Sequence, residues 1–343
     1  MTTGIIYSDR YLDHDLGPSH PEKPDRLKSI VRTLEEEGLW RADDTRLIDP
    51  TPCTEEDLKL VHDSDHIKSV KESSAAGTML DLDTPTQKNT FELALLSAGG
   101  TIKAFEQVAE GTLDDAYALV RPPGHHATRS AGGGFCYFNN IAIGIEKLRS
   151  EGKIDRAMIL DFDAHHGNGT QDIFYGNPNV LYLSFHQDGR TLYPGTGFVN
   201  EIGAEDGEGY NINVPFPPGS SDEDYASAIQ EIFIPLTEQF KPQIIAVSAG
   251  FDAHRQDPLT RLGLSTSAYG WIMKLVREQS EKLCGGRTVL VLEGGYNLDV
   301  IGDSNVEVVK ALTGKESTSP PSKGPTPQVV EEVKDTLSDY WNF

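Results

Sequence analysis

The sequence predicts an α/β fold in which helices cover both faces of a parallel β-sheet. Six short apolar runs alternate with longer stretches whose apolar residues recur at helical spacing. Continuous apolar runs of this length are typical of strands that are buried on both faces, as they are in parallel sheets. Five of the six runs are followed at once by clustered polar and glycine residues. Because ligands of parallel α/β proteins bind outside the carboxyl ends of the strands, these patterns favour one layered domain with its site at those ends.

The expected elements follow in chain order. The strands should cover 4–7, 116–120, 157–160, 180–184, 244–247 and 288–292, and the helices 25–37, 90–110, 139–150, 222–239 and 267–282. A Pro-, Ser- and Thr-rich stretch over 314–327 is typical of a linker or surface extension. Apolar spacing over 329–341 then predicts a short helix that packs back on the body. We therefore expect one domain over 1–313, followed by a linker and a short C-terminal helix over 314–343.

Composition restricts the class of protein. The chain has 343 residues, and 53 acidic against 30 basic side chains give a net charge of −23. This charge disfavours nucleic-acid binding and is compatible with a cationic substrate or a basic partner protein. Three scattered cysteines favour a reducing compartment over a disulfide framework. No apolar run reaches the roughly 18 residues of a membrane span, and the N-terminus has no signal-peptide pattern. We therefore expect a cytoplasmic protein without membrane contact.

The segment DFDAHH, after the third apolar run, predicts a metal site. Asp163 and His165 lie two residues apart, so on an extended segment both side chains face the same way. Asp252 follows the fifth run and is the expected third ligand. Two carboxylates and one imidazole leave a coordination position open, as a catalytic metal requires. The alternative interpretation is that Asp163 and Asp252 only cap helix N-termini.

A second cluster, RPPGHH followed by AGGGFCYFNN, predicts acid–base chemistry. His125 and His126 belong to the residue type that titrates near neutral pH, and they can line a pocket as a proton-handling pair. The glycines let the backbone approach a ligand closely, and Phe135 can form an apolar wall beside it. Taken alone, the two histidines would equally fit an ordinary polar loop.

Other strand ends carry further candidates. Tyr296, after Gly294 and Gly295, can donate its hydroxyl to a developing oxyanion, although a lone tyrosine also fits a packed core. Asp161 can orient His125 or bind a monovalent cation, because a buried carboxylate needs such partners. The sequence contains neither of the glycine-rich motifs that cradle nucleotide phosphates, which disfavours a nucleotide cofactor.

Eight segments of the chain form a recognisable series. They are HPEKPDRL (20–27), RPPGHHA (121–127), GGFCYFNN (133–140), DFDAHHGNGTQ (161–171), YLSFHQ (182–187), YPGTG (193–197), AGFDAHRQDPL (249–259) and LEGGYN (292–297). In this order they closely resemble the zinc-dependent histone deacetylase superfamily, which also includes acetylpolyamine amidohydrolases and acetoin-utilisation proteins. The resemblance covers about residues 4–313, and HHGNG and EGGYN are similar to the class II branch. It implies the single-domain arginase/deacetylase fold.

The resemblance also implies roles for the matched residues. The zinc ligands would be Asp163, His165 and Asp252. His126 would be the general base and then the general acid, with His125 beside it held by Asp161, and Tyr296 would stabilise the oxyanion. The implied reaction is hydrolysis of the acetamide of acetyl-lysine, or of a similar acylated amine, to acetate and free amine, with a water activated by the zinc as nucleophile. The donor set would also accept Fe²⁺ or Co²⁺.

Further residues are implied around this centre. The substrate would be flanked by Phe135, Gly134, Tyr193, Leu259, Gly295 and Asp83. One K⁺ ion would be held by Asp161, Asp163, His165, Ser184 and Phe185, and a second by Phe174, Asn177, Val180 and Tyr210. Arg26 resembles an arginine that lies near a channel for acetate release.

Three positions distinguish this chain from particular branches of the superfamily. Asn168 stands where class I members have an aspartate beside the base, and a neutral partner should leave His126 less basic. Tyr193 stands where an apolar aromatic residue often lines the tunnel, so we expect a more polar rim. Leu259 stands where polyamine-specific relatives carry a glutamate, and this change removes the charge that would select a cationic chain.

Three alternatives stay open from the sequence. An acetylpolyamine or other small-molecule amidohydrolase fits the acidic charge but not Leu259. A two-metal ureohydrolase of the same fold would need more carboxylates, where this chain has Ala164 and Gly167. A catalytically silent protein that binds acyl-lysine would be expected to lack His126 or Tyr296, and both are present. The substrate is the only partner that the sequence indicates, and a homo-oligomer is compatible with it.

Overall fold

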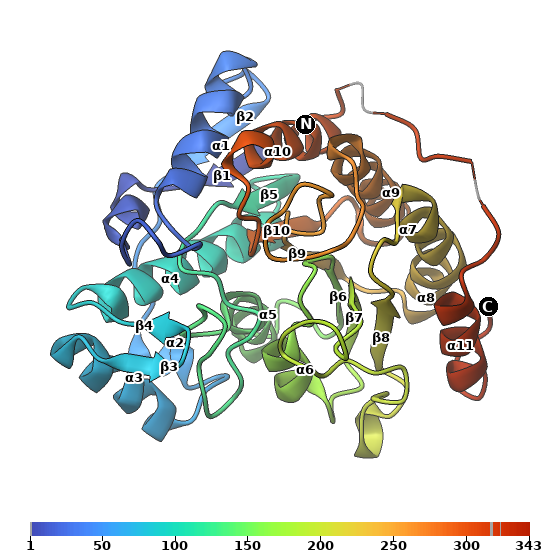
Figure 1. Ribbon diagram of the computed structural model, residues 1–343, viewed down its shortest axis with the longest axis horizontal. Coiled ribbons are helices and arrows are strands. Elements are labelled where there is room, and N and C mark those ends of the chain that lie inside the picture. Colours follow the sequence, from blue (N-terminus) through green and yellow to red (C-terminus); the bar gives the residue numbers. More distant parts are fainter. Residues whose placement is uncertain (1, 316–317, 323) are drawn as a thin grey trace.

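The computed structural model describes residues 2–315, 318–322 and 324–343 and is built around one central sheet (Figure 1). The eight strands of this sheet are all parallel, in the order β2-β1-β5-β10-β9-β6-β7-β8. They are β1 (Thr3–Ile6), β2 (Thr45–Ile48), β5 (Asp115–Ala118), β6 (Ala157–Asp161), β7 (Val180–Gln187), β8 (Asn211–Phe216), β9 (Ile244–Ala249) and β10 (Thr288–Leu292). A separate antiparallel hairpin pairs β3 (Met79–Asp81) with β4 (Thr84–Pro85). The predicted parallel α/β architecture is confirmed.

Helices cover both faces of the sheet (Figure 1). They are α1 (Asp25–Glu36), α2 (Glu55–Leu58), α3 (Ser64–Ala76), α4 (Thr90–Ala109), α5 (Asn140–Ser150), α6 (Asn168–Phe174), α7 (Asp222–Ala228), α8 (Ile234–Phe240), α9 (Thr266–Cys284), α10 (Leu298–Leu312) and α11 (Gln328–Leu337). Helix α4 packs on β1, β5 and β10 and also on α5, whereas α1, α10 and α9 form a second layer. Between the layers, the central strands are buried along their whole length.

The six predicted strands correspond to β1, β5, β6, β7, β9 and β10, with ends that differ by a few residues. The sequence did not predict β2 and β8, which are the two edge strands of the sheet. Their sequences, TRLI and NINVPF, contain charged residues, asparagine or proline in place of a continuous apolar run. β2 is partly exposed, whereas β8 is buried but contains the proline that an edge strand tolerates, so neither strand has the continuous apolar run on which the prediction depended.

The predicted helix over 222–239 is helical along its length, but it is not one regular α-helix. The segment consists of α7, one turn of π-helix (η3, Ile229–Phe233) and α8. Pro235 lies at the start of α8 and has no N–H to donate to the preceding turn, so the regular hydrogen-bond pattern cannot continue through it.

The C-terminal helix α11 packs against β8 and η3 (Figure 1). Its apolar residues Val330, Val333 and Leu337 are buried. Beyond it, the Trp341 indole donates a 2.7 Å hydrogen bond to the carbonyl of Gly209 and packs edge-on against Tyr210. The tail is therefore joined to the amino end of β8. Within the described ranges, no helix is both long enough and apolar enough to span a bilayer.

Candidate active site

The three predicted metal ligands lie together at the carboxyl ends of two neighbouring strands. Asp163 and His165 follow β6, and Asp252 follows β9, which pairs with β6 in parallel register. One ligand atom of each residue lies within 4.8 Å of those of the other two. The Nδ1 atom of His165 is 2.8 Å from Asp252 Oδ2 and 3.2 Å from Asp163 Oδ1. All three side chains are buried, so the two carboxylates and the imidazole converge on a point inside the protein.

The helix-capping interpretation of Asp163 and Asp252 is wrong. The nearest following helices, α6 and α9, are capped by Gly167 and Ser265. Backbone N–H groups orient the two carboxylates, as when Gly294 donates to Asp163 Oδ2 at 2.7 Å. A Cβ atom at position 294 would lie 2.5 Å from the carboxylate oxygens of both aspartates. Only glycine lets the backbone approach this closely.

The charges of the three ligands call for a cation. Burying two carboxylates beside one imidazole is unfavourable without positive charge between them. Burial alone lowers the pKa of His165, but the Asp252 and Asp163 carboxylates outweigh it and raise that pKa to about 10. Burial likewise raises the pKa of Asp163, but the His125 and His165 charges outweigh it and bring that pKa well below its usual range. A divalent ion would supply the positive charge directly, and this donor set fits Zn²⁺.

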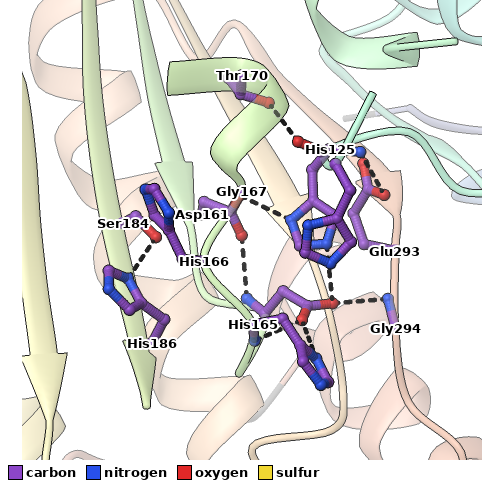
Figure 2. Close-up of polar contacts among 12 residues, drawn as sticks. His125, Asp161, His165, His166, Gly167, Thr170, Ser184, His186, Glu293 and Gly294 are labelled. Carbon is purple, nitrogen blue, oxygen red and sulfur yellow. Dashed lines mark hydrogen bonds and ion pairs between the residues drawn. The ribbon is translucent and has the colours of Figure 1, made fainter. Parts of the chain in front are cut away.

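His125 is held by carboxylates (Figure 2). Its Nδ1 atom is 3.1 Å from Asp161 Oδ2, and Asp161 also accepts a hydrogen bond from the Tyr182 hydroxyl. Burial lowers the pKa of His125, but the charges of Asp163 and Asp161 outweigh it and raise that pKa to about 10. His125 is therefore positively charged at neutral pH.

His126, its neighbour, is neutral. Its Nδ1 atom is 2.8 Å from Asn168 Oδ1, and an amide oxygen can only accept a hydrogen bond. Burial and then the charges of His125 and His165 bring the pKa of His126 well below its usual value. The ring proton therefore lies on Nδ1, and Nε2 keeps the lone pair that a general base needs.

Glu293 fixes the backbone of this histidine pair (Figure 2). It follows β10 and is fully buried, and its Oε2 atom accepts hydrogen bonds from the N–H groups of Gly124 and His125 at 2.7 and 3.1 Å. Sequence reasoning assigned it no role. Its position directly after a buried strand, within LEGGYN, was the available signal.

Aromatic rings surround His126 and the ligands. The ring centroid of Tyr193 is 5.2 Å from that of His126, and the centroids of Phe135 and Tyr296 are 5.9 Å apart. Phe135 has a φ of +69°, a conformation that is strained for a bulky residue and is typically found at functional sites. Burial and then the Asp252 charge raise the pKa of Tyr296 well above its usual value. Its hydroxyl therefore stays protonated and can donate.

Comparisons with known proteins agree with this geometry. Residues 20–312 match the family model of the histone deacetylase domain. The chain belongs to the histone deacetylase family. It is 43% identical to a probable deacetylase of Archaeoglobus fulgidus over 92% of this chain and 87% of that protein. It is 39% identical to a histone deacetylase-like amidohydrolase of Pseudomonas aeruginosa, over 87% of this chain and 78% of that protein. The solved structure of the HDA15 HD domain superposes with a TM-score of 0.91 at 35% identity, covering 99% and 95% of the two chains.

This family membership gives the fold and the class of reaction, deacetylation or amide hydrolysis. The residues predicted to flank the substrate lie on five separate loops of this histone deacetylase family member. Tyr193 and Leu259 are 42% and 38% exposed, as expected for a rim. Asp83 is half-buried, and its Oδ1 atom accepts a 3.2 Å hydrogen bond from the N–H of Gly134. Asp81, at the other side of the same hairpin turn, is exposed.

Arg26 forms a hydrogen bond with the backbone of Gly295. The Arg26 guanidinium, fully buried, donates from Nε to the carbonyl of Gly295 at 2.6 Å and from Nη2 to that of Glu293 at 2.5 Å. It also pairs with Glu22, and its charge lies 5.0 Å from the centre of the Tyr296 ring. The predicted role in acetate release stays a prediction, whereas the contacts show that Arg26 holds the loop before Tyr296.

The residues predicted to hold K⁺ occupy two places in this histone deacetylase family fold. Asp161 ends β6 and pairs with Ser184 within β7, beside Phe185, and Ser184 Oγ is 2.8 Å from His186 Nδ1 (Figure 2). The second set, Phe174, Asn177, Val180 and Tyr210, lies where α6 leads into β7 beside the start of β8. Both ion sites stay predictions.

Proposed function

We propose that the protein removes the acetyl group from acetyl-lysine in proteins or peptides, or from a similar acylated amine, as a zinc-dependent amidohydrolase. The observation that carries this proposal is the combination of three features in one site. Asp163, His165 and Asp252 form a buried set of metal ligands, His126 is neutral, and the Tyr296 hydroxyl is protonated. A base, an oxyanion donor and an open metal site are the three parts that metal-assisted amide hydrolysis needs.

The metal would be held by Asp163, His165 and Asp252. When bound, Zn²⁺ would polarise the amide carbonyl and lower the pKa of a water molecule toward about 7. We propose zinc as the ion, with Fe²⁺ or Co²⁺ as substitutes, and K⁺ at the first of the two monovalent sites.

His126 moves the proton. Its Nε2 lone pair accepts a proton from the attacking water, because Asn168 holds Nδ1 in the protonated form. The same Nε2 then donates that proton to the leaving amine. His125 keeps its charge throughout, since Asp161 stabilises it, and so it disfavours a second proton on His126 in the resting state.

Tyr296 donates its hydroxyl to the carbonyl oxygen as negative charge develops there. A single donor of this kind typically contributes about 3–4 kcal/mol to the stability of the transition state. The rings of Phe135 and Tyr193 would flank the aliphatic part of the acyl-lysine side chain.

Leu259 favours acyl-lysine over acetylpolyamine as substrate. It is partly exposed at the rim and offers no charge to a polyamine chain. The exposed Asp81 of the β3–β4 hairpin and the net charge of −23 are the observations that favour the small cationic alternative.

The experiment is acetate release from an acetyl-lysine peptide and from acetylputrescine, with zinc-loaded protein and with a chelated control. We expect peptide turnover that is lost with the metal. Turnover of acetylputrescine alone would assign the substrate to the polyamine class. If neither substrate is hydrolysed in a metal-dependent manner, the proposed activity is wrong.

A further inference from the structure

The loop from Asp252 to Leu264, between β9 and α9, contains a buried carboxylate with no role in the reaction derived above. Asp257 is 8% exposed. Burial and then the Asp252 charge raise its pKa to about 7, so a carboxylate here is unfavourable for folding. Its oxygen atoms therefore need hydrogen-bond donors inside the protein.

Both oxygens of Asp257 accept hydrogen bonds from backbone N–H groups. Oδ2 accepts from the N–H of Tyr296 at 2.8 Å, and Oδ1 accepts from the N–H of Leu259 at 2.9 Å. The Asp257 carboxylate therefore joins the backbone of Tyr296, the proposed oxyanion donor, to the backbone of Leu259 in another loop. A second contact joins the same loops, because the Asn297 amide donates to the carbonyl of Gln256 at 2.7 Å.

The segment before Tyr296 needs such an anchor. Gly295 has a φ of +117°, and a glycine pair permits many backbone conformations. Arg26 holds the carbonyls of Glu293 and Gly295, whereas Asp257 holds the N–H of Tyr296 itself. The tyrosine is thus placed by two buried charged groups that act on opposite sides of one short backbone segment.

We propose that Asp257 is a positioning residue for deacetylation, which acts by fixing the backbone of Tyr296 and, with its other oxygen, that of Leu259. This inference rests on the proposed function, since it assigns Asp257 to the step in which Tyr296 donates to the oxyanion. It does not contact the reacting atoms.

The first test is Asp257→Asn. The asparagine side chain has the same shape as the aspartate side chain. Its amide oxygen can accept from only one of the two backbone N–H groups, and its NH₂ group, which is a donor, faces the other. A displacement of the donor by about 1 Å costs up to about 100-fold in rate, so we expect kcat to fall about 10- to 100-fold. We expect KM within about 3-fold of the original value and an unchanged zinc content per chain, because ground-state binding and the ligands are not altered.

A matched control is Asp222→Asn. Asp222 accepts a 2.8 Å hydrogen bond from the N–H of Ser265, just beyond the other end of the same loop and without a contact to Tyr296. We expect kcat of this variant to stay within about 2-fold of the original value even where its Tm falls. If Asp257→Asn does not fold, Asp257→Ser, which keeps one small acceptor, gives the same comparison of kcat with KM.

The deciding measurement is a double-mutant cycle with Tyr296→Phe. If Asp257 acts through the Tyr296 hydroxyl, Asp257→Asn has little further effect on kcat once that hydroxyl is absent. Additive losses, or an unchanged kcat for Asp257→Asn alone, would overturn the inference and leave the proposed function intact. An unchanged kcat for Tyr296→Phe alone would instead overturn the proposed role of the tyrosine, and the role of Asp257 with it.

Discussion

His125 is charged and His126 is neutral, although they are neighbours on one backbone segment. The carboxylates of Asp161 and Asp163 keep His125 charged, whereas burial and the nearby cations keep His126 neutral. The two ring centroids lie only 4.0 Å apart, but the Nδ1 atom of each ring faces a different partner, Asp161 for His125 and Asn168 for His126. At the scale of single residues, the chemistry is therefore set by what lies across from each ring and not by the residue type alone.

The partner of His126 can be changed to test this directly. Asn168→Asp places a negative charge about 2.8 Å from Nδ1 and should raise the pKa of His126. A base must be unprotonated to act, so the acidic limb of the kcat/KM profile should move to higher pH, by about one pH unit or more. The measurement is kcat/KM against pH for both proteins. The exposed Asn200→Asp is the control, and coincident acidic limbs would contradict the assignment of His126 as the base.

At the scale of elements, close helix packing depends on single glycines. Helices α4 and α5 cover one face of the sheet and contact each other closely. At Gly144 in α5, an added Cβ atom would come within 2.6 Å of Phe105 Cε2 in α4. The glycine is thus required by the neighbouring helix, although it weakens its own helix.

Gly144→Ala should therefore lower the free energy of unfolding. Alanine gains about 1 kcal/mol in helix propensity, but overpacking a core contact costs about 1–3 kcal/mol. We expect a net loss of up to about 2 kcal/mol in urea unfolding, with an unchanged m-value. Gly270→Ala in α9 is the matched control, since an added Cβ atom there would lie no closer than 3.0 Å to its nearest neighbour, a carboxylate oxygen of Glu307. A Gly144 variant as stable as the original protein would show that the two helices can separate without cost.

At the scale of the whole molecule, the chain order and the spatial order differ strongly. Strands β9 and β10 enter the centre of the sheet late in the sequence, so β6 and β9 become neighbours and bring Asp163 and Asp252 together. The C-terminal tail returns to the opposite end of the sheet, where Trp341 contacts the amino end of β8. Trp341 thus lies at the end of β8 opposite to the carboxyl ends of the strands, which the metal ligands follow.

This separation predicts that the tail stabilises the fold without taking part in the reaction. Trp341→Ala removes a 2.7 Å hydrogen bond to Gly209 and the ring contacts with Tyr210 and Phe240, and should lower the free energy of unfolding by about 2–4 kcal/mol. We expect kcat/KM for the acetyl-lysine peptide to stay within about 2-fold, since the metal ligands are not contacted. The control is the more exposed Phe343→Ala. A large loss of kcat/KM at a temperature where the Trp341 variant is folded would connect the tail to the site.

The sequence by itself determined the fold class, the family and the candidate residues for the reaction. Buried strands have continuous apolar runs, and the proposed catalytic side chains such as His126 lie in the loops that follow them, so both are visible in local sequence. The edge strands β2 and β8 and the π-helical turn before Pro235 were missed, because burial and helix geometry there depend on neighbours that the local pattern does not show.

Only the tertiary structure decided how these residues are held. Glu293 and Asp257 bind backbone N–H groups of distant segments, and a backbone N–H leaves no trace in the sequence of the residue that supplies it. The charge states of His125 and His126 likewise depend on carboxylates and an amide from α6 and the end of β6. Such contacts join residues that are tens of positions apart in the chain, and folding alone brings them within hydrogen-bonding distance.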